Sequence, residues 1–462
     1  MGSPGYGSHK ESRDSRLISA VRARNADAVR ALLAEGADPD AAGEDGLPVL
    51  CAAVAAYDEV VAEALVEGGA DQDQQLPDGT TPLLRAVDLG SPAMVTAVLG
   101  NEPRLRLPQA TRERLLALAR NWYEMGAAEE LRRRTGASGP AETFQVQDDE
   151  YNHVDQVSLG GLTVRAGHGA ILTSLEWAFR ILAPVDELVA RAVRYPDEDH
   201  VDWSASCFVL SQRRSKETWS AVVAFRHHPA PAHRRFVTCF LWTRAIFESA
   251  GLHSYTKEES QLLAAWAVEE TDSEVLAKVL DIYTGHEHPG QEAIGLRHAD
   301  HPDPRVRREV PYCFHTHGTS LTPAATASLL TLARDPDSAV RSAVCTVLGT
   351  GRDLTPEITQ ALLALVRDPD TAVRASAAAA LSAPRDRTPA VTDAFAALLD
   401  EDDQQLRLEG AYGLARRDDP RTEEAYERVG PLGPSFEHDH RADGLWRWRW
   451  RNRPDQPCPD SR

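Results

Sequence analysis

The sequence predicts an all-α fold made of two α-solenoids, with a short β-hairpin in the linker between them. Two observations lead to this prediction: the first part of the chain repeats short motifs at a fixed period, and the last part repeats a different motif at a nearly constant period. Repeats of about 20–50 residues are typical of solenoids, in which each unit buries its apolar face against the next. We expect these domains: 1–15 disordered, 16–134 a repeat domain with a helical cap, 135–169 a linker, 170–430 a second solenoid, and 431–462 a basic aromatic tail or cap.

The N-terminal repeats are recognised by two short motifs. Gly-Ala-Asp at 36–38 returns at 69–71, and Asp-Gly at 45–46 returns at 78–79. Leucine and alanine positions between them recur at the same spacing. Agreement of several independent offsets makes chance a poor explanation, so we expect a stack of similar units.

Each of these units has helix start and stop signals. Thr81 is expected to cap a helix whose first residue is Pro82, which needs no amide partner there. Gly36 is expected to end a helix in the left-handed conformation. The units resemble ankyrin repeats over about residues 16–110, although Leu84 stands where that family often has His. Residues 111–134 are expected to cap the stack with two short helices.

Residues 134–169 have the composition of a linker. Glycine, serine and proline are followed by acidic residues at 148–150. The stretch 157–164 is apolar and β-prone, and it predicts a short hairpin or plug between the two solenoids.

The C-terminal repeats share a turn of Pro-Asp followed by Val and Arg. The motif stands at 302–307, 336–341 and 369–374, with a worn copy at 402–407. The turn ends one helix and caps the next. These units resemble HEAT repeats of the short bacterial kind, and weaker copies extend upstream to about residue 170.

The HEAT resemblance implies a structural role for the motif arginines. In that family they pair with acidic residues of the turns and form a ladder along the stack. Asp335 and Asp368 lie six residues before Arg341 and Arg374. We therefore interpret these residues as scaffold.

The tail contains Trp-Arg three times in succession, at 446–451. As an extended strand it would place three indoles on one face and three guanidinium groups on the other. One interpretation is a cap that covers the open end of the last repeat. The other is a cationic and aromatic contact for phosphate, a membrane surface or an acidic partner.

Composition excludes several classes of protein. There are 50 basic and 70 acidic residues, and a net charge of −20 repels the phosphate backbone, so nucleic acid is disfavoured as a partner. The sequence has no run of about 18 apolar residues, so no membrane span is expected. Residues 1–16 lack the apolar stretch of a secretory signal. We expect a cytoplasmic protein. Only four basic residues are lysine, which, with abundant alanine, suggests a GC-rich bacterial genome.

Cysteines and histidines do not form a recognisable site. The six cysteines are scattered singly without a CxxC pair, which favours buried, inert thiols over a disulfide framework. Histidines gather in turns around 286–317 and 227–233. Deoxyhypusine hydroxylase, a HEAT-repeat enzyme, holds iron through repeated His-Glu pairs, but this chain has one, at 286–287. We expect no metal and no cofactor, because ligand spacing decides a site.

An enzyme in the middle repeats is an alternative. Tryptophans there, with Asp199 or Asp202, could imitate the HEAT-like alkylpurine DNA glycosylases, which need a basic groove; the tryptophans are Trp203, Trp219, Trp242 and Trp266. The structural interpretation is that these tryptophans pack between the helices of the middle repeats. Residues 303–430 hold 15 basic and 20 acidic residues, which argues against a DNA groove there.

The function predicted is a non-enzymatic adaptor or scaffold that binds another protein, since both resemblances imply protein recognition. The ankyrin-like block has a net charge of −8 (7 basic and 15 acidic residues in 16–110), which suits a basic partner surface. A nucleic-acid or membrane-surface binder working through the tail is the other alternative. The partner-binding candidates are Asp40, Glu44, Asp73, Gln75, Arg447, Trp448 and Arg449. No catalytic residue is expected, and the oligomeric state stays open.

Overall fold

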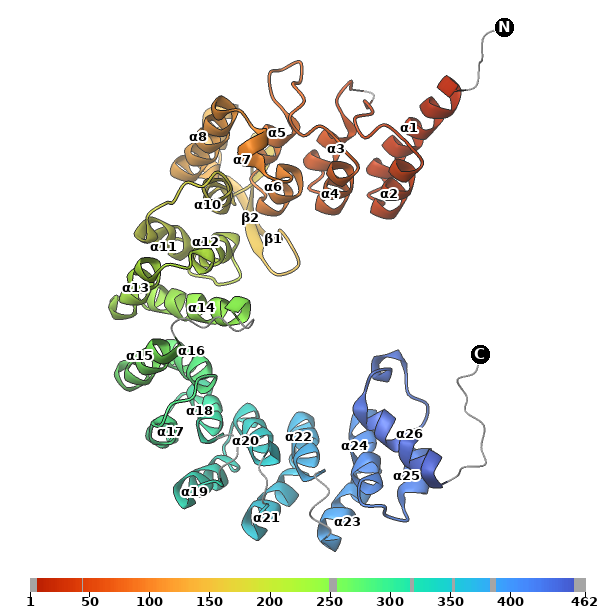
Figure 1. The fold of residues 1–462 in the computed structure, drawn as a ribbon, viewed down its shortest axis with the longest axis vertical. Helices are drawn as coiled ribbons and strands as arrows, with labels where there is room; N and C mark the ends of the chain where they lie inside the picture. The colour runs from red at the N-terminus through yellow and green to blue at the C-terminus, as the bar shows by residue number, and fades with distance from the viewer. Residues whose placement is uncertain are drawn as a thin grey trace. The chain divides into compact units, whose positions relative to one another are not determined.

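The computed structural model describes residues 6–43, 45–248, 256–315, 320–350, 354–382 and 388–452. The chain divides into two compact units, Met1–Ala250 and Gly251–Arg462. Both are helical (Figure 1), which confirms the predicted all-α class. In the described part of the chain, no helix has both the length and the apolar run that crossing a membrane requires.

The elements of the first unit are, in chain order, α1 (Tyr6–Arg22), α2 (Ala26–Ala34), α3 (Val49–Ala55), α4 (Glu59–Glu67), α5 (Pro82–Leu89), α6 (Pro92–Leu99), α7 (Pro103–Arg106), α8 (Gln109–Met125), α9 (Ala127–Thr135), β1 (Glu142–Gln147), β2 (His153–Leu159), β3 (Leu162–Arg165), α10 (His168–Ala178), α11 (Val185–Val193), α12 (Val201–Gln212), α13 (Lys216–Ala224), the 3-10 helix η1 (Phe225–His227) and α14 (Pro231–Glu248).

The first repeats stack as helix pairs in two layers, with α1, α3 and α5 in one layer and α2, α4 and α6 in the other (Figure 1). The predicted helix signals are confirmed. The Thr81 hydroxyl accepts a hydrogen bond from the amide of Leu84, and Pro82 is the first residue of α5. Gly36 follows α2 with a φ of +88°, the left-handed conformation that glycine adopts without strain.

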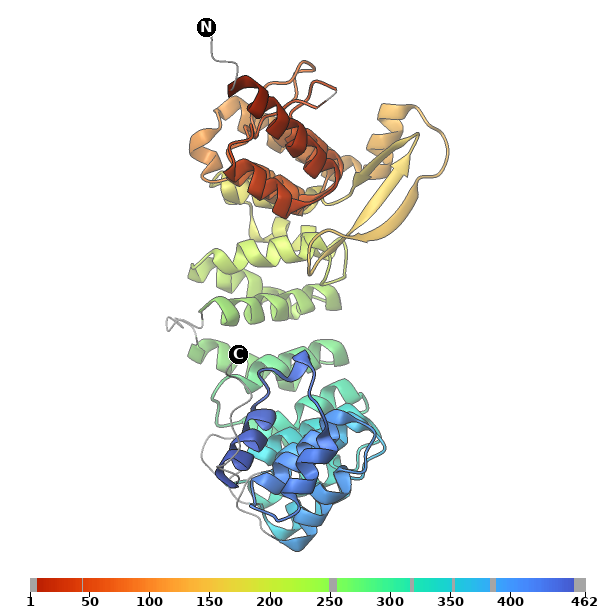
Figure 2. The ribbon, with the colours of Figure 1, turned by 90° about the vertical axis from the view of Figure 1, so that its right-hand side faces the viewer.

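The predicted hairpin at 157–164 is confirmed as β2 and β3, and β1 extends it to a three-stranded antiparallel sheet in the order β1-β2-β3. In the register, Val157 lies opposite both Thr143 and Val164. The sheet stands at the side of the helices (Figure 2). Val157 and Val164 bury themselves against Trp122 and Leu131 of α8 and α9, so the sheet is fixed to the end of the repeat stack.

One apolar core runs from α1 through the repeats into α10. It includes Leu17 at one end and Ile171 and Leu175 of α10 at the other, with Leu115 of α8 between them. Packing therefore continues across the boundary expected at residue 170. Helix α1 begins at Tyr6, inside the segment expected to be disordered. The domain limits drawn from the sequence stay predictions.

The elements of the second unit are α15 (Thr256–Glu269), α16 (Ser273–Thr284), α17 (Gln291–His298), α18 (Pro304–Glu309), η2 (Pro311–Phe314), α19 (Pro323–Leu332), α20 (Ser338–Thr350), α21 (Pro356–Leu365), α22 (Thr371–Leu381), α23 (Pro389–Leu398), α24 (Gln404–Ala415), α25 (Thr422–Val429), η3 (Pro434–Phe436) and α26 (His440–Asn452).

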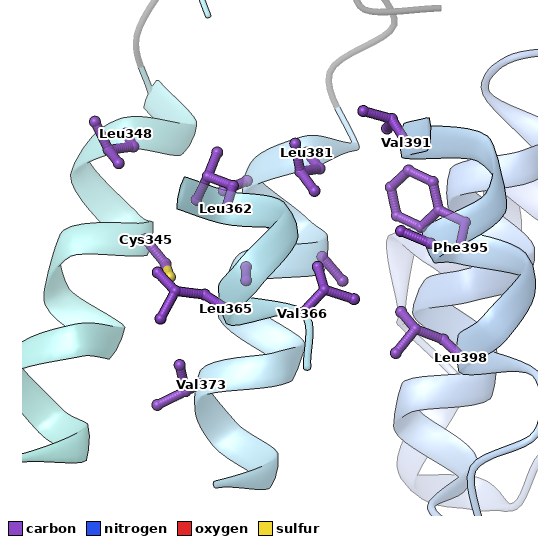
Figure 3. Packing of buried hydrophobic residues seen from close by; sticks show 14 of the residues in the cluster. Cys345, Leu348, Leu362, Leu365, Val366, Val373, Leu381, Val391, Phe395 and Leu398 are labelled. Atoms are coloured by element: carbon purple, nitrogen blue, oxygen red, sulfur yellow. The ribbon is translucent and has the colours of Figure 1, made fainter. Parts of the chain in front are cut away.

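The core of the second unit is a row of aliphatic side chains between successive helix pairs. Leu348 of α20, Leu362 and Leu365 of α21, and Val373 and Leu381 of α22 are all buried in it (Figure 3). Each repeat buries its apolar stripe against the next, as a solenoid requires.

The Trp-Arg segment of the tail is a helix, α26, and not the extended strand considered from its alternation. In a helix, residues four apart share a face, so Trp446 and Trp450 stack on each other with ring centroids 5.9 Å apart. Leu445 and Trp448 point the other way and join the core of the last repeats. The helix therefore packs on the last repeats, and its role as a cap stays a prediction.

Candidate functional site

A groove of about 940 Å³ lies in the first unit, where the second helices of the repeats face α12. Its lining residues are Glu59, Val60, Glu63, Val66, Glu67, Gln72, Pro92, Ala93, Thr96, Ala97, Gly100, Asn101, Arg106, Asp149, Asn152, Val201, Ser204, Ala205 and Phe208. We call this the acidic groove. Its volume falls within the range of roughly 300–1,000 Å³ over which proteins hold ligands or partner side chains.

Three glutamates of α4 form the acidic wall of the groove. Glu59, Glu63 and Glu67 are spaced four residues apart, so they form one stripe along the helix. Burial, and then the carboxylates of Asp148 and Asp149, raise the pKa of Glu59. Like charges at this spacing destabilise a helix by about 0.2–0.5 kcal/mol per pair. The stripe therefore lowers the stability of α4 in the unbound protein, and a bound cationic ligand would reduce this repulsion.

The described side chains form no ion pair with these three glutamates. The groove does contain Arg106, but its guanidinium is engaged with the carboxylate of Asp73 outside the groove. The field inside the groove is therefore negative.

Apolar side chains stand beside the acidic stripe. Val60 of α4 and Phe208 of α12 are each 45 % exposed, and both line the groove. On α12 the lining residues Val201, Ser204, Ala205 and Phe208 have the i, i+3, i+4, i+7 spacing of one helix face. The groove thus offers apolar contact next to negative charge.

The turn between β1 and β2 forms one edge of the groove, and Asp148 holds this turn in place. The buried Asp148 carboxylate accepts hydrogen bonds from the Ser91 hydroxyl at 2.6 Å, the Ala93 amide at 2.9 Å and the Arg165 guanidinium at 2.7 Å. This anchor places Asp149 and Asn152 at the edge of the groove. Asp148 is therefore a positioning residue that joins the sheet to α6.

A second hollow, of about 710 Å³, lies in the second unit between α24 and α26. We call it the C-terminal cleft. Its lining residues are Tyr412, Ala415, Arg416, Asp418, His440, Asp443, Gly444, Arg447, Trp450 and Arg451. Three guanidinium groups face two carboxylates, so the cleft is slightly cationic and carries an exposed indole.

Comparison with family models decides what the helix pairs are. A model of ankyrin repeats, in three copies, matches residues 17–107, and a model of HEAT repeats matches residues 326–415. The chain carries ankyrin repeats followed by HEAT repeats. Both resemblances seen in the sequence are thereby confirmed, in the predicted order. A comparison with curated proteins finds no match.

The described candidates in the ankyrin loops, Asp40, Asp73 and Gln75, do not line the acidic groove. Asp40 accepts a hydrogen bond from the amide of Asp71 in the next repeat at 2.8 Å, and Asp73 pairs with Arg106. Both therefore link neighbouring ankyrin repeats. Gln75 is exposed at a loop, and Glu44 lies outside the described residues. Their role in partner binding stays a prediction.

The three tail candidates are separated by the helix. Arg447 lines the C-terminal cleft, Trp448 is buried in the core, and Arg449 lies over the ring of Tyr426 at 4.2 Å. Trp450 and Arg451 of the same Trp-Arg segment share the cleft with Arg447, although neither was among the predicted candidates. Helical spacing in place of strand alternation would have grouped them.

The residues of the enzyme alternative are not gathered in a basic pocket. Asp202 is buried beneath α10, where it accepts a hydrogen bond from the Ala170 amide at 2.6 Å. Burial raises its pKa to about 7. Trp203 and Trp219 are buried, while Trp242 is exposed on α14. The hollow that α12 lines is the acidic groove, whose wall carries three glutamates.

Three histidines of the 286–317 stretch contact backbone groups of the chain, two of them within their own turns. His288 Nδ1 accepts from the Gly290 amide at 3.0 Å, and His301 Nδ1 accepts from the Asp303 amide at 3.1 Å. His298 Nε2 lies 2.8 Å from the Ala267 carbonyl. Among the described residues, no three His, Cys, Asp or Glu side chains gather as they would around a metal ion. His317 lies outside the described residues.

Proposed function

We propose that this chain is a non-enzymatic interaction scaffold whose acidic groove binds a basic, partly apolar segment of another protein in the cytoplasm. The observation that carries the proposal is the Glu59, Glu63 and Glu67 stripe beside exposed Val60 and Phe208. Ankyrin and HEAT repeats both suggest a protein-interaction scaffold. The four described cysteines that are buried are also free, as suits a reducing compartment.

Charge and apolar contact contribute differently to this binding. Lysine or arginine of the partner would relieve the repulsion along α4 and speed encounter through the negative field. Burial of Val60, Phe208 and an apolar partner residue would supply free energy in proportion to the area removed from water, at roughly 25 cal/mol per Å². The partner segment therefore needs both residue types on one face.

The test uses the full chain and two fluorescein-labelled amphipathic helical peptides, one of Lys and Leu and one of Glu and Leu. Fluorescence anisotropy should show binding of the Lys peptide, and this binding should weaken as salt is raised. Replacing Glu63→Lys together with Glu67→Lys should raise the Kd by about tenfold or more, which is ~1.4 kcal/mol.

The matched control is Glu113→Lys together with Glu124→Lys on α8. It changes the net charge equally, but both positions lie outside the groove. Equal weakening by the two double variants would mean that only overall charge matters, and the groove proposal would then be wrong. Capture of partners from a lysate with the wild-type chain and the Glu63/Glu67 variant would next identify the protein that depends on the groove.

The C-terminal cleft supports a second candidate, binding of an acidic protein segment. The described part of the chain offers no ion pair to Arg447 or Arg451, and Trp450 beside them is 48 % exposed. The Glu and Leu peptide is the probe. If it binds the wild-type chain but not a variant with Arg447→Gln and Arg451→Gln, the cleft is its site; binding that survives both changes rules the cleft out.

A further inference from the structure

Two cysteines that are far apart in the sequence meet in the first unit. Cys207 of α12 and Cys239 of α14 have their Sγ atoms 3.0 Å apart. Their separation along the chain is close to the length of one repeat, so they occupy corresponding places on helices that pack together. The two thiols, scattered singly in the sequence, are therefore neighbours in space, and that they are inert stays a prediction.

The surroundings of the two thiols are unequal. Cys207 is buried, whereas Cys239 is partly exposed to solvent. The Thr243 hydroxyl lies 3.2 Å from the Cys207 sulfur. A hydrogen bond with the Cys207 thiol is the largest influence on Cys239 and lowers its pKa, while burial raises the pKa of Cys207. Cys239 is thus the more accessible and more readily ionised thiol of the pair.

We propose that Cys207 and Cys239 are a peroxide-oxidised pair that closes into a disulfide between α12 and α14. A partly exposed cysteine with a second thiol in contact is the arrangement in which a first oxidation is resolved by a neighbour. This site goes beyond the proposed binding function and does not depend on it.

The chemistry is balanced with one hydrogen peroxide. The Cys239 thiolate attacks a peroxide oxygen, the O–O bond breaks, and the departing hydroxide takes the thiol's proton to become water. Cys239 is then a sulfenic acid. The Cys207 sulfur attacks the Cys239 sulfur, the S–O bond breaks, and the leaving hydroxide takes the Cys207 proton as a second water. Two thiols and one peroxide give one disulfide and two waters.

The oxidised form would fix α12 to α14. Helix α12 carries Phe208, the neighbour of Cys207, into the acidic groove. The disulfide would close a loop between adjacent helices, which restricts the unfolded chain. We expect oxidation to raise the Tm of the first unit by about 5 °C.

The experiment uses the reduced full chain. It is treated with hydrogen peroxide near equimolar ratio, quenched with catalase, alkylated in denaturant and digested with trypsin. Cleavage after arginine places Cys207 in the peptide 195–213 and Cys239 in the peptide 236–244. Mass spectrometry should find these two peptides joined, two hydrogen atoms lighter than their sum, while the other cysteines are alkylated.

The chain contains its own comparison. Cys313 and Cys345 have the same separation in the sequence, but both are buried and burial raises the pKa of each to about 12. Their peptides should stay fully alkylated. In a Cys207→Ser variant, Cys239 should be trapped as a sulfenic acid by dimedone, and a Cys51→Ser variant should still form the cross-link.

Three results would overturn the proposal: complete alkylation of both cysteines after peroxide, a stable sulfenic or sulfinic acid on Cys239 of the wild-type chain without cross-link, or preferential pairing of either cysteine with another one. The decisive measurement is made on the wild-type chain, so it does not depend on whether the serine variants fold.

Discussion

Arg341 joins one HEAT repeat to the next through Asp368. Its Nε and Nη2 donate to the two carboxylate oxygens of Asp368 at 2.8 and 2.7 Å, while Nη1 donates to the carbonyls of Asp335 and Pro336 in its own turn. The side chains are 12 % and 7 % exposed. Arg307 holds Asp335 in the same way one repeat earlier. The predicted ladder is therefore present, with each carboxylate contributed by the following turn.

Removing the charge of Asp368 should destabilise the second unit. Asp368→Asn leaves a largely buried guanidinium without its counter-charge, and we expect a loss of about 2–4 kcal/mol in the free energy of unfolding. Glu401→Gln is the matched change, because Glu401 meets Arg374 at 3.3 Å and is 36 % exposed. It should cost less than about 1 kcal/mol. Urea unfolding of the full chain measures both losses. Equal losses would mean that the buried Arg341–Asp368 pair stabilises the unit no more than the exposed Arg374–Glu401 pair does.

Gly90 sets the distance between the ankyrin repeats and the sheet. A Cβ at this position would lie 1.8 Å from the carbonyl oxygen of Arg165, and φ is +78°. Gly90→Ala must therefore displace β3 or α5, and we expect a loss of more than about 3 kcal/mol.

Gly46 is the control for this substitution. Its φ is +73°, but a Cβ there would meet no atom of the described residues within 4 Å. Gly46→Ala should cost about 1 kcal/mol, from backbone strain alone. Urea unfolding that gives both variants the same stability would show that the contact with Arg165 is not what requires glycine.

Local signals and repeat period were sufficient to predict most of the fold. Thr81 and Pro82 start a helix because their capping chemistry is local, and the arginine ladder recurs because each turn repeats the same residues. The strand β1 was not predicted, since its side chains are largely exposed and show no buried alternation. For the tail, Trp-Arg alternation suited a strand, but packing against the last repeat selects a helix.

The acidic groove could not be located from the sequence. Its walls come from α4, α6, the β1–β2 turn and α12, which are widely separated along the chain, and only packing brings them together. A part of the signal was present: Glu59, Glu63 and Glu67 are spaced for one helix face. The predicted loop residues Asp40 and Asp73 instead contact neighbours within the chain. Asp40 accepts a hydrogen bond from the Asp71 amide, and Asp73 forms an ion pair with Arg106.

Trp448 is the anchor of the C-terminal cap. It is buried in the last core with Leu445, whereas Trp446 on the same helix is 41 % exposed. Trp448→Ala should lower the free energy of unfolding by about 3–5 kcal/mol through loss of buried area and the cavity left behind. Trp446→Ala should cost about 1 kcal/mol, from its stacking with Trp450. Similar losses in thermal unfolding would mean that α26 does not act as a cap.

The buried Asp202 should contribute less to the stability of the first unit as pH rises. Burial is the main cause that raises its pKa to about 7, against an ordinary value of 3.8. The folded chain then binds a proton that the unfolded chain has released, so this contribution to stability is present at low pH and is lost as pH rises from about 4 to 7. His168 and His200 act in the opposite sense: burial lowers the pKa of each to about 4, so their contribution is lost as pH falls from about 6.5. In the wild-type chain these effects partly cancel.

The substitution Asp202→Asn separates the contribution of Asp202 from that of the two histidines. The amide keeps the shape and the acceptor for the Ala170 amide but does not ionise, so the variant should gain stability relative to the wild-type chain as pH rises from 4 to 7, by up to about 4 kcal/mol. The remaining histidine contribution should make the variant's own stability increase over the same range. Thermal unfolding of both chains at half-unit pH steps measures the difference. A difference that stays constant with pH would mean that Asp202 titrates normally, because only a carboxyl whose pKa differs between the folded and unfolded chain can make stability depend on pH.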